Sequence, residues 1–159
     1  MSCEPFHVVL VEPQIPPNTG NVIRLCANTG ARLHLIGPMG FPLNDAKMRR
    51  AGLDYHERCL AQTHVDWTSF LDAARPPKGR SFGLTTKAAT SVFDCAFEPG
   101  DWLFFGSETS GLSAVQRDWF TEVRLLRLPM RSGNRSLNLS NAVAVVAYEA
   151  LRQTGLPTG

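Results

Sequence analysis

Three loops rich in glycine, serine and asparagine carry the residue types best suited to binding a ligand. They cover residues 106–111, the stretch that follows Leu128, and residues 136–141. Each loop begins where an apolar run ends, and each run has the pattern of a strand buried in a parallel sheet. Because ligands bind at the carboxyl ends of strands in open α/β sheets, we predict that the three loops form one pocket built largely of backbone.

The loop at 106–111 has the glycine spacing of a phosphate-binding loop but lacks its cation. Leu112 and Ser113 stand where Lys and Ser or Thr would hold the β and γ phosphates, so nucleotide hydrolysis is disfavoured. No Gly-x-Gly-x-x-Gly follows any predicted strand, which weakens the alternative of a nucleotide-dependent oxidoreductase. A tight turn without a ligand is the alternative for this loop alone, and the two later loops favour a binding role.

A second candidate site lies at the start of the first predicted helix. Residues 16–21 precede a helix that contains Arg24, and free amides at a capped helix start suit an anion such as a backbone phosphate. Arg24 lies one turn into a helix of otherwise apolar and small residues. Its guanidinium is either directed at a phosphate or a developing oxyanion, or extended over the sheet surface.

The last loop and the helix after it add further polar candidates. Four hydroxyl and amide side chains lie within residues 136–141, and helix capping requires only one or two of them. Tyr148 follows on a helix dominated by alanine and valine, where it is either a buried tyrosine with a satisfied hydroxyl or a site residue. Basic side chains at loop ends either face solvent or follow RNA phosphates. They are Arg24, Lys47, Arg49, Arg50, Lys87, Arg131 and Arg135.

Alternating strands and helices must position these loops. Apolar runs predict strands at 6–11, 32–36, 81–84, 102–105 and 123–128, with a weaker strand near 58–61. Helical spacing and capping residues predict a helix from Thr19 to Gly30, a short basic helix at 45–52, and further helices that begin at Asp66, Ser113 and Leu139. The first strand, helix and strand form a β-α-β unit with a right-handed crossover.

The composition is that of a soluble globular protein. The chain has 159 residues, 43% of them hydrophobic and 19% charged, which suits a single α/β domain over residues 1–159. A net charge of +2 gives no general attraction to nucleic acid, so local clusters would have to bind it. No run approaches the roughly 20 apolar residues of a membrane span, and the start lacks a signal peptide, so we expect a cytoplasmic protein.

The cysteines and histidines do not predict a metal site. The four cysteines are widely separated, with no Cys-x-x-Cys pair and no zinc-like spacing, and we expect them to be reduced and mostly buried. The four histidines form no ligand pair. We therefore expect no metal.

Taken together, the motifs resemble those of the SPOUT RNA 2′-O-methyltransferases. The resemblance lies in residues 16–24, residues 105–112, and residues 128–130 together with 136–141, and it runs over essentially the whole chain. Residues 24–30 and 50–57 also resemble the subfamily of small enzymes that methylate the wobble ribose of tRNA. The motifs are specific as a set, whereas none is decisive alone.

The resemblance implies a fold, a cofactor and an assembly. The expected fold is a doubly wound, mostly parallel sheet whose C-terminal segment threads a loop in a deep trefoil knot, an exception to the rule against knots. The expected cofactor is S-adenosylmethionine, held in the knot loops. The expected assembly is a homodimer in which RNA and cofactor meet near the interface. Carried over by motif, the cofactor-binding residues are Leu84, Gly106, Leu128, Met130, Ser136 and Asn138.

The resemblance also assigns catalytic and RNA-binding residues. Arg24 takes the position of the essential arginine of the family, and Tyr148 helps to form the catalytic site. An arginine, with a pKa above about 12, is a poor base, so we interpret Arg24 as a phosphate anchor that stabilises the developing alkoxide. Asn18, Lys87 and Arg135 are expected to bind RNA together with Arg24.

Two alternatives remain close to this interpretation. Ribosomal RNA 2′-O-methyltransferases share the chemistry but usually carry an N-terminal RNA-binding domain. Here the first strand begins by about Phe6, so we expect no appended domain and favour tRNA as the substrate. The other alternative is a non-catalytic RNA-binding module, and the presence of Arg24 argues against it.

Overall fold

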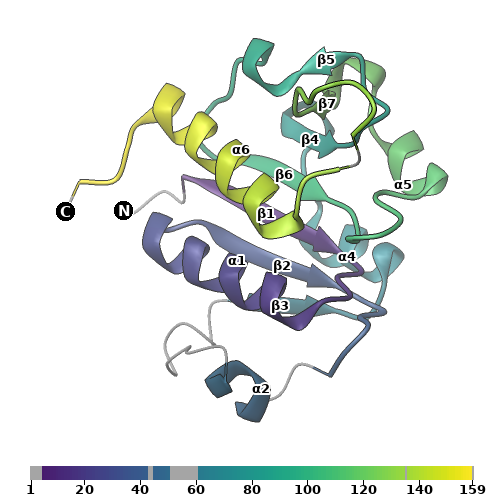
Figure 1. Cartoon of the computed structure of the whole chain (residues 1–159), viewed down its shortest axis with the longest axis vertical. Coiled ribbons are helices and arrows are strands. Elements are labelled where there is room, and N and C mark those ends of the chain that lie inside the picture. The colour runs from purple at the N-terminus through teal and green to yellow at the C-terminus, as the bar shows by residue number, and fades with distance from the viewer. Residues whose placement is uncertain (1–4, 43–44, 51–60, 135, 159) are drawn as a thin grey trace.

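The computed structural model describes residues 5–42, 45–50, 61–134 and 136–158. Its strands form one seven-stranded sheet in the order β3-β2-β1-β6-β4-β7-β5, and all six strand pairings are parallel (Figure 1). The mostly parallel α/β sheet predicted from the sequence is therefore confirmed. The strands are β1 (Phe6–Val11), β2 (Arg32–Ile36), β3 (Ala61–His64), β4 (Ser81–Leu84), β5 (Thr90–Ser91), β6 (Asp101–Phe105) and β7 (Leu125–Arg127).

Helices cover both faces of this sheet. α1 and α6 lie side by side on one face, with α6 in yellow above α1 in purple (Figure 1). The helices are α1 (Pro16–Thr29), α2 (Asp45–Arg50), α4 (Trp67–Ala74), α5 (Ala114–Trp119) and α6 (Leu139–Thr154), and the 3-10 turns are η1 (Lys78–Arg80), η2 (Val92–Asp94) and η3 (Glu122–Arg124). None of the helices that the structure describes is long and apolar enough to cross a membrane.

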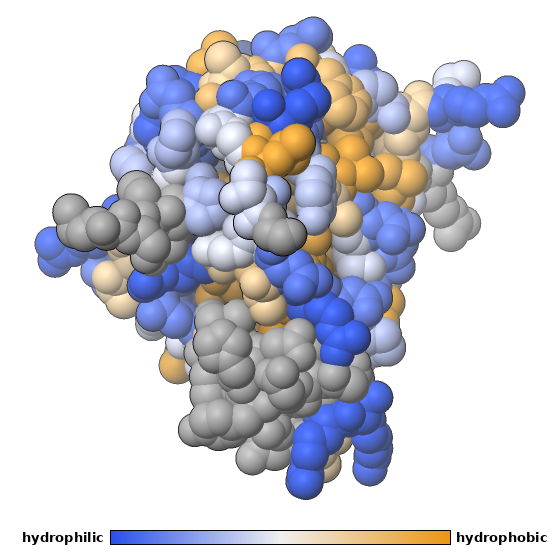
Figure 2. All heavy atoms as spheres, turned by 90° about the vertical axis from the view of Figure 1, so that its left-hand side faces the viewer, coloured by the Kyte–Doolittle hydropathy of each residue, from blue (hydrophilic) through white to orange (hydrophobic). Residues whose placement is uncertain are grey.

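The short helix α2 lies at the lower end of the molecule. Its Arg49 and Arg50 are exposed, and the coloured atoms at the lowest tip of the surface are mostly hydrophilic (Figure 2). α2 begins at Asp45, where the basic helix was predicted to start, and the predicted end at Gly52 lies outside the described residues. The helix therefore presents its charge to solvent.

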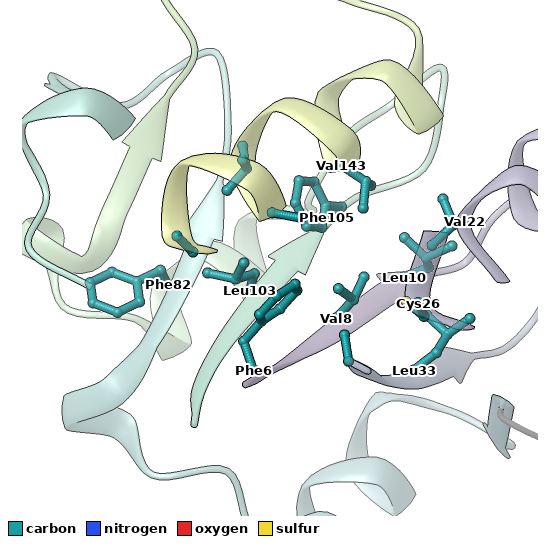
Figure 3. Close-up of a cluster of buried hydrophobic side chains, with 14 of the residues drawn as sticks. Phe6, Val8, Leu10, Val22, Cys26, Leu33, Phe82, Leu103, Phe105 and Val143 are labelled. Carbon is teal, nitrogen blue, oxygen red and sulfur yellow. The ribbon is translucent and has the colours of Figure 1, made fainter. Parts of the chain in front are cut away.

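The sheet is buried on both faces because its central strands carry apolar side chains on both of their sides. Along β1, Phe6, Val8 and Leu10 join the core beneath α1 and α6 (Figure 3). Val9 and Val11 point to the opposite face, where they meet Phe70 of α4 and Phe120 after α5. Side chains alternate across a strand, so only a continuous apolar run supplies both cores.

The start of α1 corrects one prediction. Thr19 was expected to cap this helix, but the helix begins at Pro16, with proline in its first two positions. Proline is favoured there because its fixed φ suits the first turn and its missing N–H has no helical partner in any case. Thr19 therefore lies inside the helix and is buried.

Other helix ends follow the predicted local chemistry. Gly30 ends α1 with a φ of 81°, and its N–H donates to the Cys26 carbonyl. Asp66 caps α4 by accepting from the Ser69 N–H at 2.8 Å. Ser113 caps α5 in a reciprocal box with Gln116. These ends are confirmed because each depends on residues within a single turn.

Strand boundaries were predicted best at the centre of the sheet. β1, β2 and β4 have the predicted bounds, and β6 begins one residue early. The weak strand expected at 58–61 is found as β3 at Ala61–His64, and residues 58–60 lie outside the described part. The last strand is shorter than predicted because Glu122–Arg124 forms a 3-10 turn. The two-residue β5 was missed because it is too short to show a period.

The structure brings together three histidines that are distant in the sequence. His7, His34 and His64 come from β1, β2 and β3, and their rings stack in a row. The His7 Nδ1 and His34 Nε2 atoms are 3.3 Å apart, as are the His34 Nδ1 and His64 Nε2 atoms. Trp102 of β6 stacks on His7 with ring centroids 3.8 Å apart. Within the described ranges, no group of three or more His, Cys, Asp or Glu side chains is placed to hold a metal ion.

Burial controls the ionisation of this row and of the described thiols. Burial, with smaller contributions from the neighbouring His7 and His64, lowers the pKa of His34 to about 3. Cys26 and Cys95 are free thiols, and burial raises their pKa values to about 12 and about 11. Cys3 and Cys59 lie outside the described residues. His34 is therefore neutral at physiological pH.

The buried His34 predicts a loss of stability in acid. Its pKa is about 3 in the folded chain and 6.5 ordinarily, so only the unfolded chain takes up a proton between these values. The free energy of unfolding should be greatest above pH 6.5 and fall as the pH drops toward 3. Denaturant titrations at stepped pH measure this slope. His34→Gln should flatten it and the less buried His64→Gln should flatten it less, whereas an unchanged slope in His34→Gln would contradict the assignment.

Candidate functional site

The loops that follow β4, β6 and β7 meet at the carboxyl edge of the sheet. They enclose a cavity of about 190 Å³, lined by residues 84–87, residues 105–112, Leu128, Met130 and Ser136, among others. The predicted meeting of the three polar loops is confirmed, because parallel strands deliver their carboxyl ends to one edge. β6 and β4 are hydrogen-bonded neighbours, and β7 adjoins β4.

The cavity has apolar walls and a polar rim. Leu84, Leu112 and Leu128 form part of the wall, while Ser107, Thr109 and Ser110 belong to the rim. Five of the predicted cofactor residues line it: Leu84, Gly106, Leu128, Met130 and Ser136. The sixth, Asn138, does not line it and instead caps α6 by accepting from the Asn141 N–H at 3.2 Å.

The loop after β6 closes tightly on itself at Gly106. A Cβ at this position would lie 2.1 Å from the Gly111 carbonyl carbon and 2.1 Å from the Leu112 nitrogen. Ser107 and Gly111 form an antiparallel bridge, and the Ser107 and Ser110 hydroxyl oxygens are 2.6 Å apart. Any side chain at residue 106 would therefore displace the backbone that lines the cavity.

Glu108 in this loop binds the start of α1. Its Oε1 accepts from the Gln14 N–H at 2.8 Å, and its Oε2 accepts from the Ile15 N–H at 2.7 Å. The Asn18 side-chain amide also donates to Oε2 at 3.2 Å. A carboxylate is stabilised at a helix start by the free N–H groups and by the helix dipole. The anion at this helix start is thus the chain's own Glu108.

Asn18 extends this network to the third loop. It is only 5% exposed, and its Oδ1 accepts from the Asn138 side-chain amide at 3.0 Å. Asn138 in turn accepts from the Ser140 hydroxyl at 2.7 Å. Three loops that are distant in the sequence are therefore joined by one chain of hydrogen bonds through Glu108, Asn18 and Asn138.

The remaining predicted residues are placed differently. Lys87 is exposed and lines the cavity. Arg24 is exposed on α1, and Tyr148 is 45% exposed on α6, but neither lines the cavity. Asn18 uses its side chain inside the protein, and Arg135 lies outside the described residues. A single copy of the described chain therefore does not bring the predicted catalytic pair to the cavity.

A second, more polar hollow adjoins the cavity. Its volume is about 580 Å³, and it is lined by Arg127, Arg131 and the turn at 132–134. It shares Thr86 and Glu108, among other residues, with the cavity. No role was predicted for Arg127 from the sequence. Its position at the end of an apolar strand run was a signal for a basic residue at the site. Glu108 was likewise unassigned, although it is the single acidic residue of the loop at 106–111.

Arg117 contributes a further cation to the cavity wall. It lies on α5, lines the cavity, and donates from Nη1 to the Leu112 carbonyl at 2.6 Å. The hydrogen bond fixes the guanidinium against the end of the loop that begins at Gly106. Arg117 therefore supports the loop's shape.

The chain matches known proteins over nearly its whole length. It matches the sequence model of the SpoU rRNA Methylase family over residues 5–148. A tRNA (cytidine(34)-2′-O)-methyltransferase from Burkholderia pseudomallei (strain 1106a) is 63% identical over 154 residues, which cover 97% of this chain and 99% of the relative.

Solved structures agree with this similarity. One that gives structural insights into the 2-OH methylation of C/U34 on tRNA superposes with a TM-score of 0.83 at 43% identity, covering 93% of this chain and 95% of that chain. The SpoU methyltransferase AviRb from Streptomyces viridochromogenes, in complex with the cofactor AdoMet, superposes with a TM-score of 0.78 at 27% identity. That match covers 96% of this chain and 59% of AviRb.

The Glu108 network predicts a measurable loss when its charge is removed. Glu108→Gln replaces one carboxylate oxygen by an amide donor, which faces an N–H donor and loses a charge-assisted bond worth about 1.5–3 kcal/mol. The free energy of unfolding should fall by that order, and the Gln14 and Ile15 amides should exchange faster with solvent. Denaturant unfolding and amide hydrogen exchange measure both effects.

The control is Glu122→Gln, which removes the same charge from an exposed residue of η3. It should change stability by less than about 0.5 kcal/mol. Equal effects of the two substitutions would show that the Glu108 contacts do not hold the loops together.

Proposed function

The chain belongs to the SpoU rRNA methylase family, and on this premise we propose that it methylates the ribose 2′-hydroxyl of nucleotide 34 in tRNA, with S-adenosylmethionine as the methyl donor. The observation that carries the proposal is the cavity at the carboxyl edge of the sheet, whose lining includes residues of two of the three motif regions, 105–112 and 128–130 with 136–141. The relative from Burkholderia pseudomallei supports the choice of tRNA and of position 34.

The cavity suits the chemistry of S-adenosylmethionine. Its apolar walls fit the adenine ring of the cofactor, and its polar rim offers backbone and hydroxyl groups to the ribose of the cofactor. When bound, the cofactor would supply a sulfonium methyl group for transfer to the ribose 2′-oxygen, with S-adenosylhomocysteine as the leaving group and the hydroxyl proton released to water. The residues proposed to hold it are Leu84, Gly106, Leu128, Met130 and Ser136. Asn138 positions them by fixing the start of α6.

Arg24 is the proposed catalytic cation. A guanidinium, with a pKa above about 12, is a poor base but a strong donor to phosphate and to a developing alkoxide. The Glu108 network fixes the start of α1, the helix that carries Arg24. Tyr148, exposed on the neighbouring α6, is proposed to border the same RNA-facing site.

In a homodimer, Arg24 of one subunit could lie at the cavity of the other subunit. Arg24 lies outside the cavity of its own chain, on the layer formed by α1 and α6. This layer and the loops that lead into it expose large apolar side chains to solvent, namely Ile15, Leu137, Val145 and Tyr148. Exposed apolar side chains of this kind are typical of protein interfaces. We propose that a second copy covers this surface and that Arg24 acts at the partner's cavity.

The C-terminal segment is proposed to form the trefoil knot of the SPOUT fold. Family membership supports this, as does the course of the chain, since the segment that leads into α6 lines the same cavity as the loop after β6. Pulling the chain from its two ends in a force spectrometer measures the unfolded length. A knotted chain extends less than its residue number allows, and full extension would exclude the knot.

The first experiment is transfer of a labelled methyl group from S-adenosylmethionine to bulk RNA, followed by mapping of the modified nucleotide. Label on the ribose of nucleotide 34 in tRNA is the expected result. Label confined to ribosomal RNA would overturn the substrate. Cofactor binding without any transfer would overturn the activity.

A mixing experiment tests the proposed exchange of arginines. Arg24→Ala should lose turnover while keeping cofactor binding, and Gly106→Ala should lose cofactor binding because its Cβ collides with the loop backbone. Each variant alone should be inactive. A one-to-one mixture should recover up to about a quarter of the wild-type activity, because about half of its dimers are mixed and each mixed dimer has one complete site of two. Absence of recovery in confirmed mixed dimers would show that Arg24 serves its own chain or has another role.

A matched control keeps the second variant informative. Gly79→Ala adds the same methyl group where no atom lies within 4 Å, so it should leave cofactor binding unchanged. If Gly79→Ala also lost cofactor binding, the loss in Gly106→Ala would reflect general instability and not a collision with the loop backbone.

A further inference from the structure

Within the described part of the chain, three basic side chains without an acidic partner lie in or beside the cavity. Arg127 is half-buried at the end of β7, and Arg131 is exposed on the loop that follows. Both line the second hollow, and Lys87 lines the adjoining cavity. Among the described residues, none of the three has an ion pair or a hydrogen-bond partner for its charged group. The edge of the sheet that carries the site is therefore positively charged and uncompensated.

Most other described cations are used within the protein. Arg80 pairs with Asp101, and Arg152 pairs with Glu149. Further cations have partners of other kinds, with Arg117 on the Leu112 carbonyl, Lys78 over the Trp119 ring and Arg124 over the Phe82 ring. Unpaired cations close together repel one another, so their concentration beside the cavity indicates an anion that comes from outside the chain.

The one carboxylate in the wall of the hollow does not neutralise these cations. Glu108 lines the hollow, but both of its oxygens accept hydrogen bonds from the start of α1. No described arginine or lysine lies within ion-pair distance of it. Arg127 and Arg131 thus remain available to a ligand.

The cofactor itself does not explain the charge. S-adenosylmethionine carries a sulfonium and an ammonium against one carboxylate, so its net charge is positive. Lys87 at its binding site and the two arginines beside that site would weaken its binding by like-charge repulsion, unless a polyanion is bound there as well. RNA is such a polyanion, and the proposed reaction brings its backbone to this edge of the sheet.

We propose that the hollow lined by Arg127 and Arg131 binds the RNA phosphates that flank the target ribose. The inference rests on the proposed function and names the part of the substrate that the hollow takes. Arg127 is fixed by the strand, while Arg131 begins a turn in which the Asn134 N–H donates to the Arg131 carbonyl and Gly133 has a φ of 84°. One guanidinium from the end of a strand and one from the following loop bind the backbone next to the cavity, and Lys87 adds positive charge in the cavity wall.

The test separates RNA binding from cofactor binding. The double variant Arg127→Gln with Arg131→Gln is compared with the wild-type protein by titration with tRNA over a range of salt concentrations. The affinity for tRNA should fall about tenfold, and the slope of log affinity against log salt should decrease by about 0.7 for each lost contact with a single-stranded phosphate. Binding of S-adenosylmethionine without RNA, measured by calorimetry, should stay unchanged or tighten.

The control is Arg75→Gln, which removes an exposed arginine at the C-terminal end of α4. This helix runs back against the parallel strands, so residue 75 lies at the opposite edge of the sheet. Its salt slope should match the wild type.

Four results would overturn the inference. Weaker cofactor binding with an unchanged salt slope in the double variant would assign the arginines to the cofactor carboxylate. An equal loss of slope in Arg75→Gln would show a general charge effect. If the double variant bound and methylated tRNA as well as the wild-type protein does, the hollow would have no role in RNA binding and the proposed function would stand. If the wild-type protein neither bound nor methylated tRNA, both proposals would be wrong.

Discussion

The contact between the Glu108 carboxylate and the start of α1 is the interaction on which the site depends. Two backbone N–H groups and the Asn18 amide converge on it, and Asn18 passes the connection to Asn138 at the start of α6. The loop that lines the cavity is thereby fixed to the helix that carries Arg24. A charged acceptor on a helix start is strong because the helix dipole and the unpaired N–H groups act in the same direction.

This internal anion also decides where an external anion can bind. Since Glu108 occupies the start of α1, an RNA phosphate has no free amide at Gln14 or Ile15. The unpaired cations lie instead beyond β4 and β7, around the second hollow. The sheet thus separates two tasks along one edge, with the carboxylate organising the loops on the β1 side and the arginines offering charge on the β7 side.

Local features were predicted well wherever one turn of chain decides them. Asp66 caps α4 and Gly30 ends α1 because a cap needs only its own side chain or its own φ. The apolar runs of β1 and β6 identified central strands because burial on both faces favours apolar side chains on both sides of a strand. The predictions that were wrong, such as Thr19 as a helix cap and the bounds of the last strand, involved several competing local signals: two prolines could begin the helix earlier, and a 3-10 turn could shorten the strand.

The parallel α/β class and the polar loops beside the cavity could be predicted from apolar runs and loop composition, because both are local properties of the chain. The resemblance to a family added five residues that line the cavity. Only the tertiary structure decided that Asn18 is buried in a network, that His7, His34 and His64 stack across three strands, and that Arg127 and Arg131 share a hollow without an acidic partner among the described residues. These features depend on which strands become neighbours and on where each side chain finds its partner. Contacts between residues distant along the chain leave no periodic pattern in it.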